Sequence, residues 1–263
     1  DNGERNIRPK GRFRFYLDKI GIEKFRDLVE KQYGELKEDP GSTFSDKPRS
    51  FFGIHPQKQE NKYYAGIHVP VGRLLAEDLQ DLANICNSFG DKEIRLTEDQ
   101  NIIITGIDTD LIEEFKKQFI LQKFPLEPEA IAAGTVSCTG NTYCGFALTN
   151  TKDQALKISH ELDKELEMKD ELKIHWTGCP NSCGQAYMGG IGLTGKKAKD
   201  KEGKTVEAYD ICIGGSQGPN YKLGELIKKS VPQDELKDVL KDLLISNFDA
   251  KEKIFLSNKS GSL

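Results

Sequence analysis

The sequence predicts an α+β protein, with helices on one face of an antiparallel sheet. The first observation is the order of periodic segments between residues 62 and 120, which runs strand, helix, strand, strand, helix. The second is the connection between the two middle strands, which is only the three residues 98–100. The expected elements are strands at 62–72, 93–97 and 101–107 and helices at 75–88 and 110–120.

The individual elements follow from their apolar spacing. Leu75, Leu79, Leu82 and Cys86 recur at helical intervals, which predicts the helix at 75–88. The two segments "EIRLT" and "NIIITGI" are short apolar runs and are predicted to be strands, joined by "EDQ". Together these segments indicate a two-layer α/β sandwich.

The segments on either side are predicted in the same way. A helix is expected at 17–32, where apolar residues share one stripe, and a polar linker rich in Pro, Gly and Ser at 34–50. The tail after Phe255 is polar and is expected to fray. The second half is expected to contain helices at 151–167 and 234–248 and strands at 172–176 and 206–215.

Length and charge limit the class of protein. A chain of 263 residues is long enough for one or two domains. The net charge of −4 argues against a general nucleic-acid binder. No apolar run approaches the roughly 20 residues of a membrane span, and the start has no signal-peptide core. The absence of an initiator Met makes residue 1 a processed end or an internal cut.

Two local basic runs stand out, "RPKGRFR" at 8–14 and "KKAKDKEGK" at 196–204. Solvated loops are the simpler interpretation of each run. The alternative is docking of an acidic protein partner, because opposite potentials steer encounter.

The six cysteines fall into two groups. Cys86 lies on the apolar stripe of a helix and Cys212 inside a strand, so packing is expected for both. The other four lie in loops rich in Gly, Pro and Asn, namely Cys138, Cys144, Cys179 and Cys183. Such loops leave backbone N–H groups free to point inward.

The spacing of these four thiols, five residues in "CTGNTYC" and three in "CPNSC", favours an iron–sulfur cluster. Zinc pairs have gaps of about two to four residues, whereas a cubane needs thiolates at four separated corners. From spacing alone, zinc and two disulfides remain open.

The same residues resemble the signature of the sirohaem-containing nitrite and sulfite reductases. "IHPQKQE", "HVPVGR", "IRLTEDQNIII" and "HWTGCPNSCGQ" are similar to that family in the same order, over nearly the whole chain. The resemblance implies a helix and linker at 1–50, a ferredoxin-like α/β sandwich half-domain at 51–123, and an α+β sirohaem and iron–sulfur domain at 124–263.

The resemblance also implies a ligand set. Cys138, Cys144, Cys179 and Cys183 would bind a 4Fe–4S cluster, and Cys183 would also be the axial ligand of the sirohaem iron. Four further positions look like family contacts of the sirohaem: Gln100, Asn101, Asn181 and Arg95. Sirohaem has many carboxylates and needs amide and guanidinium donors, for which Arg73 is a further candidate. The simpler alternatives are turn residues for Asn181 and Gln100 and an exposed strand charge for Arg95.

Within the family, "CTGNTYC" and "HPQKQ" look more like the ferredoxin-dependent nitrite reductases than the sulfite reductases. The implied reaction is the reduction of nitrite to ammonium by six electrons from ferredoxin, an acidic donor. The alternatives are an assimilatory sulfite reductase and a non-catalytic iron–sulfur or zinc module. A bacterial cytoplasm and a plastid stroma both suit such an enzyme.

Family members are about twice as long, and their substrate-binding Arg and Lys come largely from a first half that this sequence does not match. The N-terminal half of the same enzyme is therefore an expected partner, and no catalytic residue is assigned here. His175, next to the cysteine loop, is expected to be structural or to support a ligand rather than to deliver protons.

Overall fold

The structure is a computed structural model that describes residue 6 and residues 13–36, 50–218 and 221–253. The chain divides into two compact units, Asp1–Ser45 and Asp46–Leu263. Most of the expected linker at 34–50, most of the basic run at 8–14 and the tail after Phe255 lie outside the described residues.

The first unit contains two helices, α1 (Phe13–Ile20) and α2 (Ile22–Tyr33). The sequence predicts a single helix at 17–32, and this was wrong because Gly21 has φ 82°, ψ 155° and interrupts the helical backbone. The rings of Phe13 and Phe25 meet edge to face at 5.1 Å between centroids, which joins the two helices.

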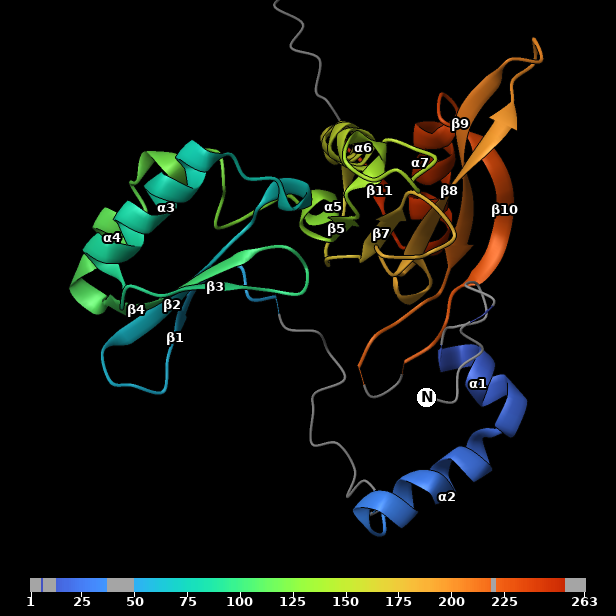
Figure 1. The fold of residues 1–263 in the computed structure, drawn as a ribbon. Helices are drawn as coiled ribbons and strands as arrows, with labels where there is room; N and C mark the ends of the chain where they lie inside the picture. Colours follow the sequence, from blue (N-terminus) through green and yellow to red (C-terminus); the bar gives the residue numbers. More distant parts are fainter. Residues whose placement is uncertain (1–5, 7–12, 37–49, 219–220, 254–263) are drawn as a thin grey trace, which may run out of the picture. The chain divides into compact units, whose positions relative to one another are not determined.

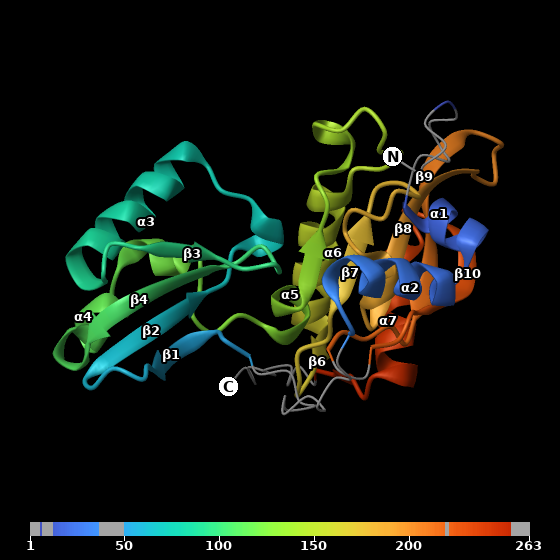
Figure 2. The ribbon, with the colours of Figure 1, turned by 60° about the horizontal axis from the view of Figure 1, so that its bottom comes forward.

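The second unit begins with a four-stranded sheet in the order β1-β2-β4-β3. The strands are β1 (Gly53–Pro56), β2 (Lys62–Ile67), β3 (Ile94–Leu96) and β4 (Ile102–Asp108). All neighbours are antiparallel, as predicted. The helices α3 (Ala76–Phe89) and α4 (Ile112–Phe115) lie on one face of this sheet (Figures 1 and 2).

Three details of this sheet differ from the prediction. β1 was not expected, the strand at 62–72 ends at Ile67, and the helix at 110–120 is reduced to the single turn of α4 between 3-10 turns. The strand ends early because Pro70 lacks a backbone N–H and opens the 3-10 turn Pro70–Gly72.

The core of the sheet depends on alternating side chains. Ile102 and Ile104 of β4 are buried; beyond them Gly106, at φ 80°, shifts the alternation so that Ile107 is buried as well. The buried set shared with the helices includes Ala65, Ile67, Leu82, Ile85, Cys86, Phe89 and Phe115. Cys86 therefore packs in the core, which confirms its predicted structural role.

The rest of the second unit contains a five-stranded sheet in the order β10-β9-β8-β7-β5. Its strands are β5 (Thr135–Ser137), β7 (Ile174–Thr177), β8 (Ile191–Lys199), β9 (Thr205–Ile213) and β10 (Glu225–Pro232). β5, β7 and β8 are parallel, whereas β8, β9 and β10 are antiparallel. The predictions missed β5, β8 and β10.

Helices α6 (Thr151–Glu165) and α7 (Leu236–Asn247) share one core with this sheet. Trp176 and Tyr209, both fully buried, meet edge to face at 5.3 Å in that core. Two shorter elements complete the fold: α5 (Ala130–Ala133), and the pair β6 (Leu166–Glu167) and β11 (Lys251–Glu252). Cys212 is buried in β9, as predicted. The predicted domain boundary at 123/124 stays a prediction.

Candidate functional site

The two cysteine loops begin at the ends of neighbouring parallel strands. β5 and β7 pair in register, with Ser137 opposite Trp176, so their carboxyl ends lie at the same edge of the sheet. The Cys138 N–H continues this pairing by donating to the Trp176 carbonyl at 3.0 Å. The carboxyl end of a parallel sheet is where α/β proteins place their ligands.

The loops contact each other directly. The backbone N–H of Gly178 donates to Cys138 Sγ at 3.2 Å, and the Leu148 N–H donates to the Gly178 carbonyl at 2.7 Å. A Cβ at Gly178 would lie 2.9 Å from the Cβ of Ala147, so the two loops approach each other too closely for a larger residue. A backbone N–H on a cysteine sulfur is the kind of hydrogen bond that tunes iron–sulfur ligands.

The first loop, 138–149, is fastened at its base. Gly140 has φ 69°, and a Cβ there would lie 2.6 Å from Thr151 Oγ1. The same Thr151 hydroxyl donates to the Cys138 carbonyl at 2.7 Å, and the Cys144 N–H donates to the Gly140 carbonyl at 3.1 Å. The protein's own hydrogen bonds therefore hold the loop closed around Cys138 and Cys144.

The second loop, 178–185, is also built on backbone turns. The Ser182 N–H donates to the Cys179 carbonyl at 3.2 Å, and the Gly184 N–H donates to the buried Thr177 Oγ1 at 2.8 Å. Ser182 has φ 55°, which turns the chain between the two cysteines. Cys179 is buried and Cys183 is exposed.

All six cysteines are free thiols. Burial raises the pKa of both Cys86 and Cys212, and Cys86 Sγ donates to the Glu93 carbonyl at 3.2 Å, as expected of packed thiols. Among the described residues, no three His, Cys, Asp or Glu side chains form a group that could hold a metal ion. The structure thus brings the two cysteine loops together without closing the four thiols into one ligand set.

The donor chemistry fits a 4Fe–4S cluster all the same. Four free thiols lie on two loops that leave the same sheet edge, and one of the sulfurs already accepts a backbone hydrogen bond. Thiolates with backbone N–H donors are the usual environment of such clusters.

The side-chain amides of Gln100 and Asn101 form hydrogen bonds within the protein. Gln100 Nε2 donates to the Ser137 carbonyl at 2.8 Å, and Asn101 Oδ1 accepts from the Val69 N–H at 2.9 Å. Asn101 Nδ2 donates to the Asp99 carbonyl, and only 3% of this residue is exposed. The predicted sirohaem contacts of these two residues stay predictions.

The remaining predicted residues lie at the surface. Asn181 is exposed in the turn between Cys179 and Cys183. Arg95, on the edge strand β3, pairs with Glu93 at 3.3 Å, and Arg73 pairs with Asp153 at 2.6 Å. Asn181 lies in the cysteine loop, whereas the structure places Arg95 on the four-stranded sheet; neither prediction is tested by this geometry.

Lys152 is a residue that sequence reasoning missed. It lies in the first turn of α6, and its ammonium donates to the carbonyl of Val71 and, at 3.3 Å, to that of Ser137. Burial and the nearby Arg73 lower the pKa of Lys152, while the neighbouring Cys138 acts in the opposite direction. Asn150 caps α6 by accepting from the Asp153 N–H, so the helix begins at Thr151 and Lys152 lies in its first turn.

His175 is buried in β7, with 2% of its surface exposed. Its Nδ1 lies 3.2 Å from the Gln185 carbonyl, and burial lowers its pKa, which favours the neutral ring. The ring therefore braces the end of the second cysteine loop, which agrees with its predicted structural role.

Two hollows lie elsewhere in the second unit. A groove of about 1080 Å³ is lined by Glu98, Asp99, Glu127, Asp170, Glu171, Lys169 and Lys173, together with apolar residues. Lys173 is already paired with Asp99 and Glu171 at 2.6 and 2.5 Å. With acids in excess over lysines, this groove does not suit a cofactor with many carboxylates.

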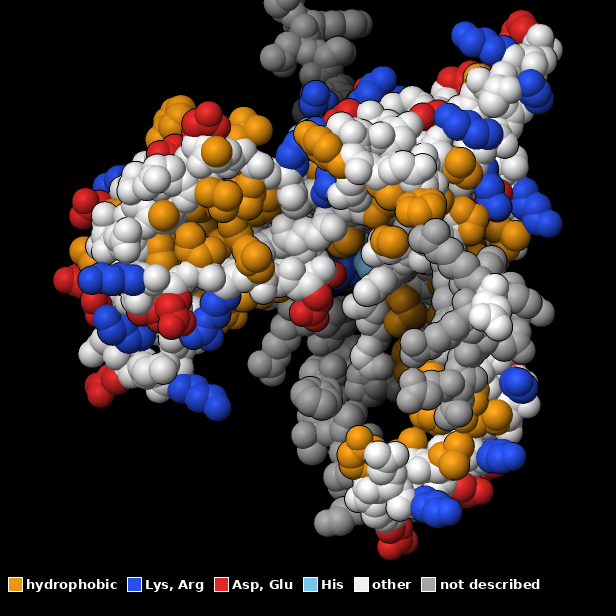
Figure 3. Space-filling model, viewed as in Figure 1, with side chains coloured by type: hydrophobic (Ala, Val, Ile, Leu, Met, Phe, Trp, Pro, Cys, Tyr) orange, Lys and Arg blue, Asp and Glu red, His pale blue; other side chains and the backbone are white. Residues whose placement is uncertain are grey.

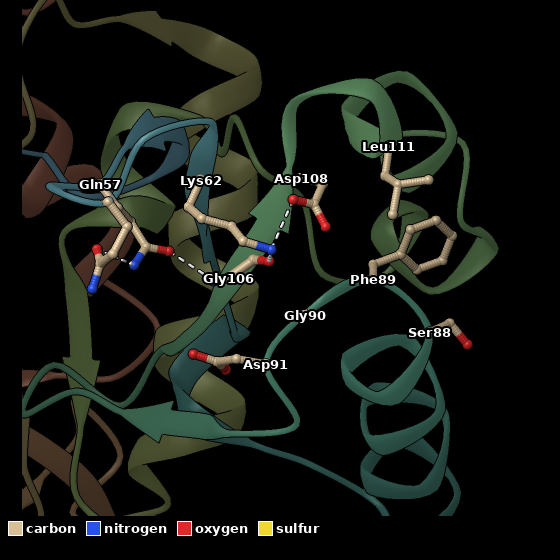
Figure 4. A pocket seen from close by; sticks show the side chains of 10 residues that line it. Gln57, Lys62, Ser88, Phe89, Gly90, Asp91, Gly106, Asp108 and Leu111 are labelled. Carbon is tan, nitrogen blue, oxygen red and sulfur yellow. Dashed lines mark hydrogen bonds and ion pairs between the residues drawn. The ribbon is translucent and has the colours of Figure 1, made fainter.

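A smaller cavity of about 280 Å³ lies against the four-stranded sheet (Figure 4). Its polar groups satisfy one another: Gln57 Oε1 accepts from the Gly106 N–H at 2.7 Å, and Lys62 pairs with Asp108 at 2.7 Å. Neither hollow is part of the cysteine site.

The basic run at 196–204 forms the hairpin between β8 and β9, where acidic and basic side chains mix at the surface (Figure 3). Lys196 pairs with Asp210 at 3.4 Å and Lys197 with Glu207 at 3.5 Å. Part of the positive charge is thus balanced locally, and docking of an acidic partner here stays a prediction.

None of the helices in the described part of the chain has the length and apolar character of a membrane span.

Comparison with known proteins decides the family. The family model described as "Nitrite/Sulfite reductase ferredoxin-like half domain" matches residues 55–120. The model described as "Nitrite and sulphite reductase 4Fe-4S domain" matches residues 132–249. The chain belongs to the nitrite and sulfite reductase family. Membership implies a 4Fe–4S cluster together with sirohaem, and the second match spans both cysteine loops and the five-stranded sheet.

Relatives in this family extend the comparison over almost the whole chain. A ferredoxin–nitrite reductase of Synechococcus elongatus is 43% identical over 254 residues, which are 96% of this chain and 49% of that protein. A chloroplastic ferredoxin–nitrite reductase of Oryza sativa is 42% identical, covering 95% of this chain and 43% of that protein. The chain thus spans about half the length of these relatives.

A solved structure shows the same fold. The NirA protein of Mycobacterium tuberculosis superposes with a TM-score of 0.83 at 24% identity, over 92% of this chain and 46% of that one. This likeness confirms the α+β fold class predicted from the sequence.

Proposed function

We propose that this chain is the cofactor-holding part of a ferredoxin-dependent nitrite reductase, which reduces nitrite to ammonium with six electrons and eight protons. The supporting observation is the meeting of the two cysteine loops at the end of β5 and β7, where Gly178 donates to Cys138 Sγ. The names of the relatives support nitrite as the substrate and ferredoxin as the donor.

In this proposal Cys138, Cys144, Cys179 and Cys183 hold the 4Fe–4S cluster, and Cys183 also binds the sirohaem iron. The exposed position of Cys183 suits a sulfur that faces a second group outside the loop. When bound, the paired cofactors supply single-electron transfer and an open iron coordination position for the substrate.

The chain's own residues have narrower roles. The Gly178 N–H stabilises negative charge on Cys138, and Asn181, between the two paired cysteines, is the predicted residue best placed to reach a group bound at Cys183. The hydrogen bond between Gly184 and Thr177 keeps the second loop closed, so that Cys179 and Cys183 stay near the first loop. The binding and protonation of nitrite are proposed to need residues outside this chain.

The proposed compartment is the cytoplasm of a bacterium or a plastid stroma, in line with relatives from cyanobacteria and chloroplasts. The proposed partners are ferredoxin, nitrite and the remaining half of the enzyme.

The test reconstitutes the chain with iron, sulfide and sirohaem, alone and together with the remaining half, taken from the sequence of a relative. We expect about four irons per chain bound as a cluster, a Soret band from the haem, and nitrite reduction by reduced methyl viologen only with both halves. Full turnover by the chain alone would contradict the fragment interpretation. Zinc without iron would contradict the redox function, and a preference for sulfite would contradict nitrite as the substrate.

A further inference from the structure

Ser137 is the last residue of β5 and directly precedes Cys138. In the five-stranded sheet β5 is an edge strand, with β7 on one side only. Cys138 N–H and Gly134 C=O point toward β7, where they bond the Trp176 carbonyl and the Ile174 N–H. In a parallel strand the backbone groups of successive residues point to alternate sides, so the backbone N–H and C=O of Ser137, next to Cys138, face the free edge.

Two side chains occupy that free edge. Gln100 pairs with both backbone groups of Ser137: Nε2 donates to the carbonyl at 2.8 Å, and Oε1 accepts from the N–H at 3.4 Å. Lys152 donates a further hydrogen bond to the Ser137 carbonyl at 3.3 Å. A side-chain amide and an ammonium thus replace the missing neighbouring strand, and Ser137 is fully buried beneath them.

The backbone that presents these groups is held in unusual conformations. Val71 has φ 48°, Gly72 has φ 62° and Gln100 has φ 67°. A β-branched residue such as Val at positive φ is a strained conformation, and it persists only where the surroundings enforce it. Here Lys152 binds the Val71 carbonyl, and a Cβ at Gly72 would lie 2.5 Å from the Cβ of Gln100.

Val71 also connects the turn Pro70–Gly72 to the part of the unit that contains the five-stranded sheet. Its side chain is 3% exposed and belongs to the core formed by α6 and the five-stranded sheet, not to that of the four-stranded sheet. Arg73 adds an ion pair to Asp153 at 2.6 Å. The turn Pro70–Gly72 and the turn before β4 therefore meet at the carboxyl end of β5.

We propose that Gln100 and Lys152 are positioning residues that hold Ser137, and through it Cys138, in place for cluster binding, and that the Lys152 ammonium also favours the reduced cluster. The proposal rests on the proposed function, because Cys138 matters only as a cluster ligand. A cation beside Cys138 stabilises added negative charge, so its removal makes the reduction potential more negative.

The first measurement uses the full chain without cofactors. Amide hydrogen exchange at Ser137 and Cys138 is followed by NMR in the parent chain and in Gln100→Leu, Lys152→Met and Lys157→Met. Lys157 is an exposed lysine on the same helix and serves as the control. We expect exchange about fivefold faster in Gln100→Leu and Lys152→Met, since one lost hydrogen bond is worth about 1 kcal/mol. Lys157→Met is expected to match the parent.

The second measurement uses the chain loaded with the cluster. Its midpoint potential should become more negative in Lys152→Met, return toward the parent value in Lys152→Arg, and stay unchanged in Gln100→Leu and Lys157→Met. A purely structural role would not separate Lys152→Met from Gln100→Leu in this way. If Lys152→Met does not fold, Lys152→Gln, which removes the charge but keeps a polar side chain, replaces it in both measurements.

The proposal is overturned if Gln100→Leu and Lys152→Met exchange like the control, or if Lys152→Met keeps the parent potential. Failure of the proposed function and failure of the positioning role can be told apart. A parent chain that takes up no cluster contradicts the proposed function and the electrostatic role of Lys152, whereas the exchange rates at Ser137 judge the positioning role independently.

Discussion

The backbone N–H of Gly178 donates to Cys138 Sγ at 3.2 Å across a sequence separation of 40 residues. This contact links the residue before one cysteine pair to the first cysteine of the other. It exists because β5 and β7 are parallel neighbours, so that the loops after them leave the same sheet edge. The pairing of strands, rather than the spacing of cysteines, thus brings the two motifs together.

Replacement of Gly178 by Ala should disturb this contact. The new Cβ would lie 2.9 Å from the Cβ of Ala147, and an overpacked site typically costs about 1–3 kcal/mol. We expect a lower midpoint of denaturant unfolding and less iron bound per chain after reconstitution. Gly203→Ala, at a position with open space for a Cβ, is a control for the handling of the variants, although its φ of 79° adds local strain of its own. Unchanged iron content in Gly178→Ala would contradict a role for the contact.

Replacement of Thr177 by Val should loosen the second cysteine loop. The hydroxyl of Thr177 accepts the Gly184 N–H at 2.8 Å, and both residues are buried. A buried N–H left without its partner costs about 1–3 kcal/mol, and Val has nearly the same shape as Thr. We expect Thr177→Val to lose that free energy of unfolding and to bind the cluster more weakly, whereas Thr177→Ser should retain both. Equal stability of the Val and Ser variants would show that the hydroxyl does not matter.

Absorption spectra should distinguish the loop cysteines from the packed cysteines. Cys183→Ser is expected to alter both the cluster and the haem absorption of the reconstituted protein, since Cys183 is proposed to bind both. Cys86→Ser should leave both spectra intact, because Cys86 lies on α3 and packs in the core of the four-stranded sheet, away from the cysteine loops. Loss of the cluster in Cys86→Ser would overturn the sorting of the six thiols.

His68 should make the unfolding free energy sensitive to pH. Burial is the largest cause that lowers its pKa from 6.5 to about 4, and only 2% of the residue is exposed. A depressed pKa favours the neutral ring in the folded state. The contribution of His68 to the free energy of unfolding is therefore complete above pH 6.5, and it is lost as the pH falls toward 4. The shift corresponds to about 3 kcal/mol.

The measurement compares denaturant unfolding across this pH range in the parent and in His68→Phe, which keeps an aromatic ring but cannot titrate. The pH dependence should flatten in His68→Phe and remain in His160→Gln, where the histidine is exposed. Identical slopes for the parent and His68→Phe would show that His68 is not the responsible group.

The strongest sequence predictions came from regular periodicity. The helix at 75–88, the strands at 93–97 and 101–107 and the helix at 151–167 correspond to α3, β3, β4 and α6. The missed strands had weak local signals: β5 has only three residues, β8 contains two glycines, and most of β10 is exposed. Pairing with neighbours makes these segments strands, and no short window of sequence contains that information.

The candidate site shows the same division. The separation of Cys86 and Cys212 from the loop cysteines followed from their apolar surroundings, and both are buried in the structure. The cofactor contact predicted for Gln100 from the resemblance stays a prediction, whereas the pairing of its amide with the backbone of Ser137 was not predicted. Lys152 was not predicted at all, because its partners are backbone carbonyls, which leave no mark in a sequence.

By itself, the sequence determined the class of fold, the helical and strand segments with clean periodicity, the two kinds of cysteine and the family. Those properties depend on the type and spacing of residues along the chain. Only the tertiary structure decided that the loops after β5 and β7 touch, that Gln100 and Lys152 cover the edge of β5, and that Val71 is held in a strained turn. These features arise from strand pairing and close packing between residues far apart in the sequence, and their geometry exists only after the chain has folded.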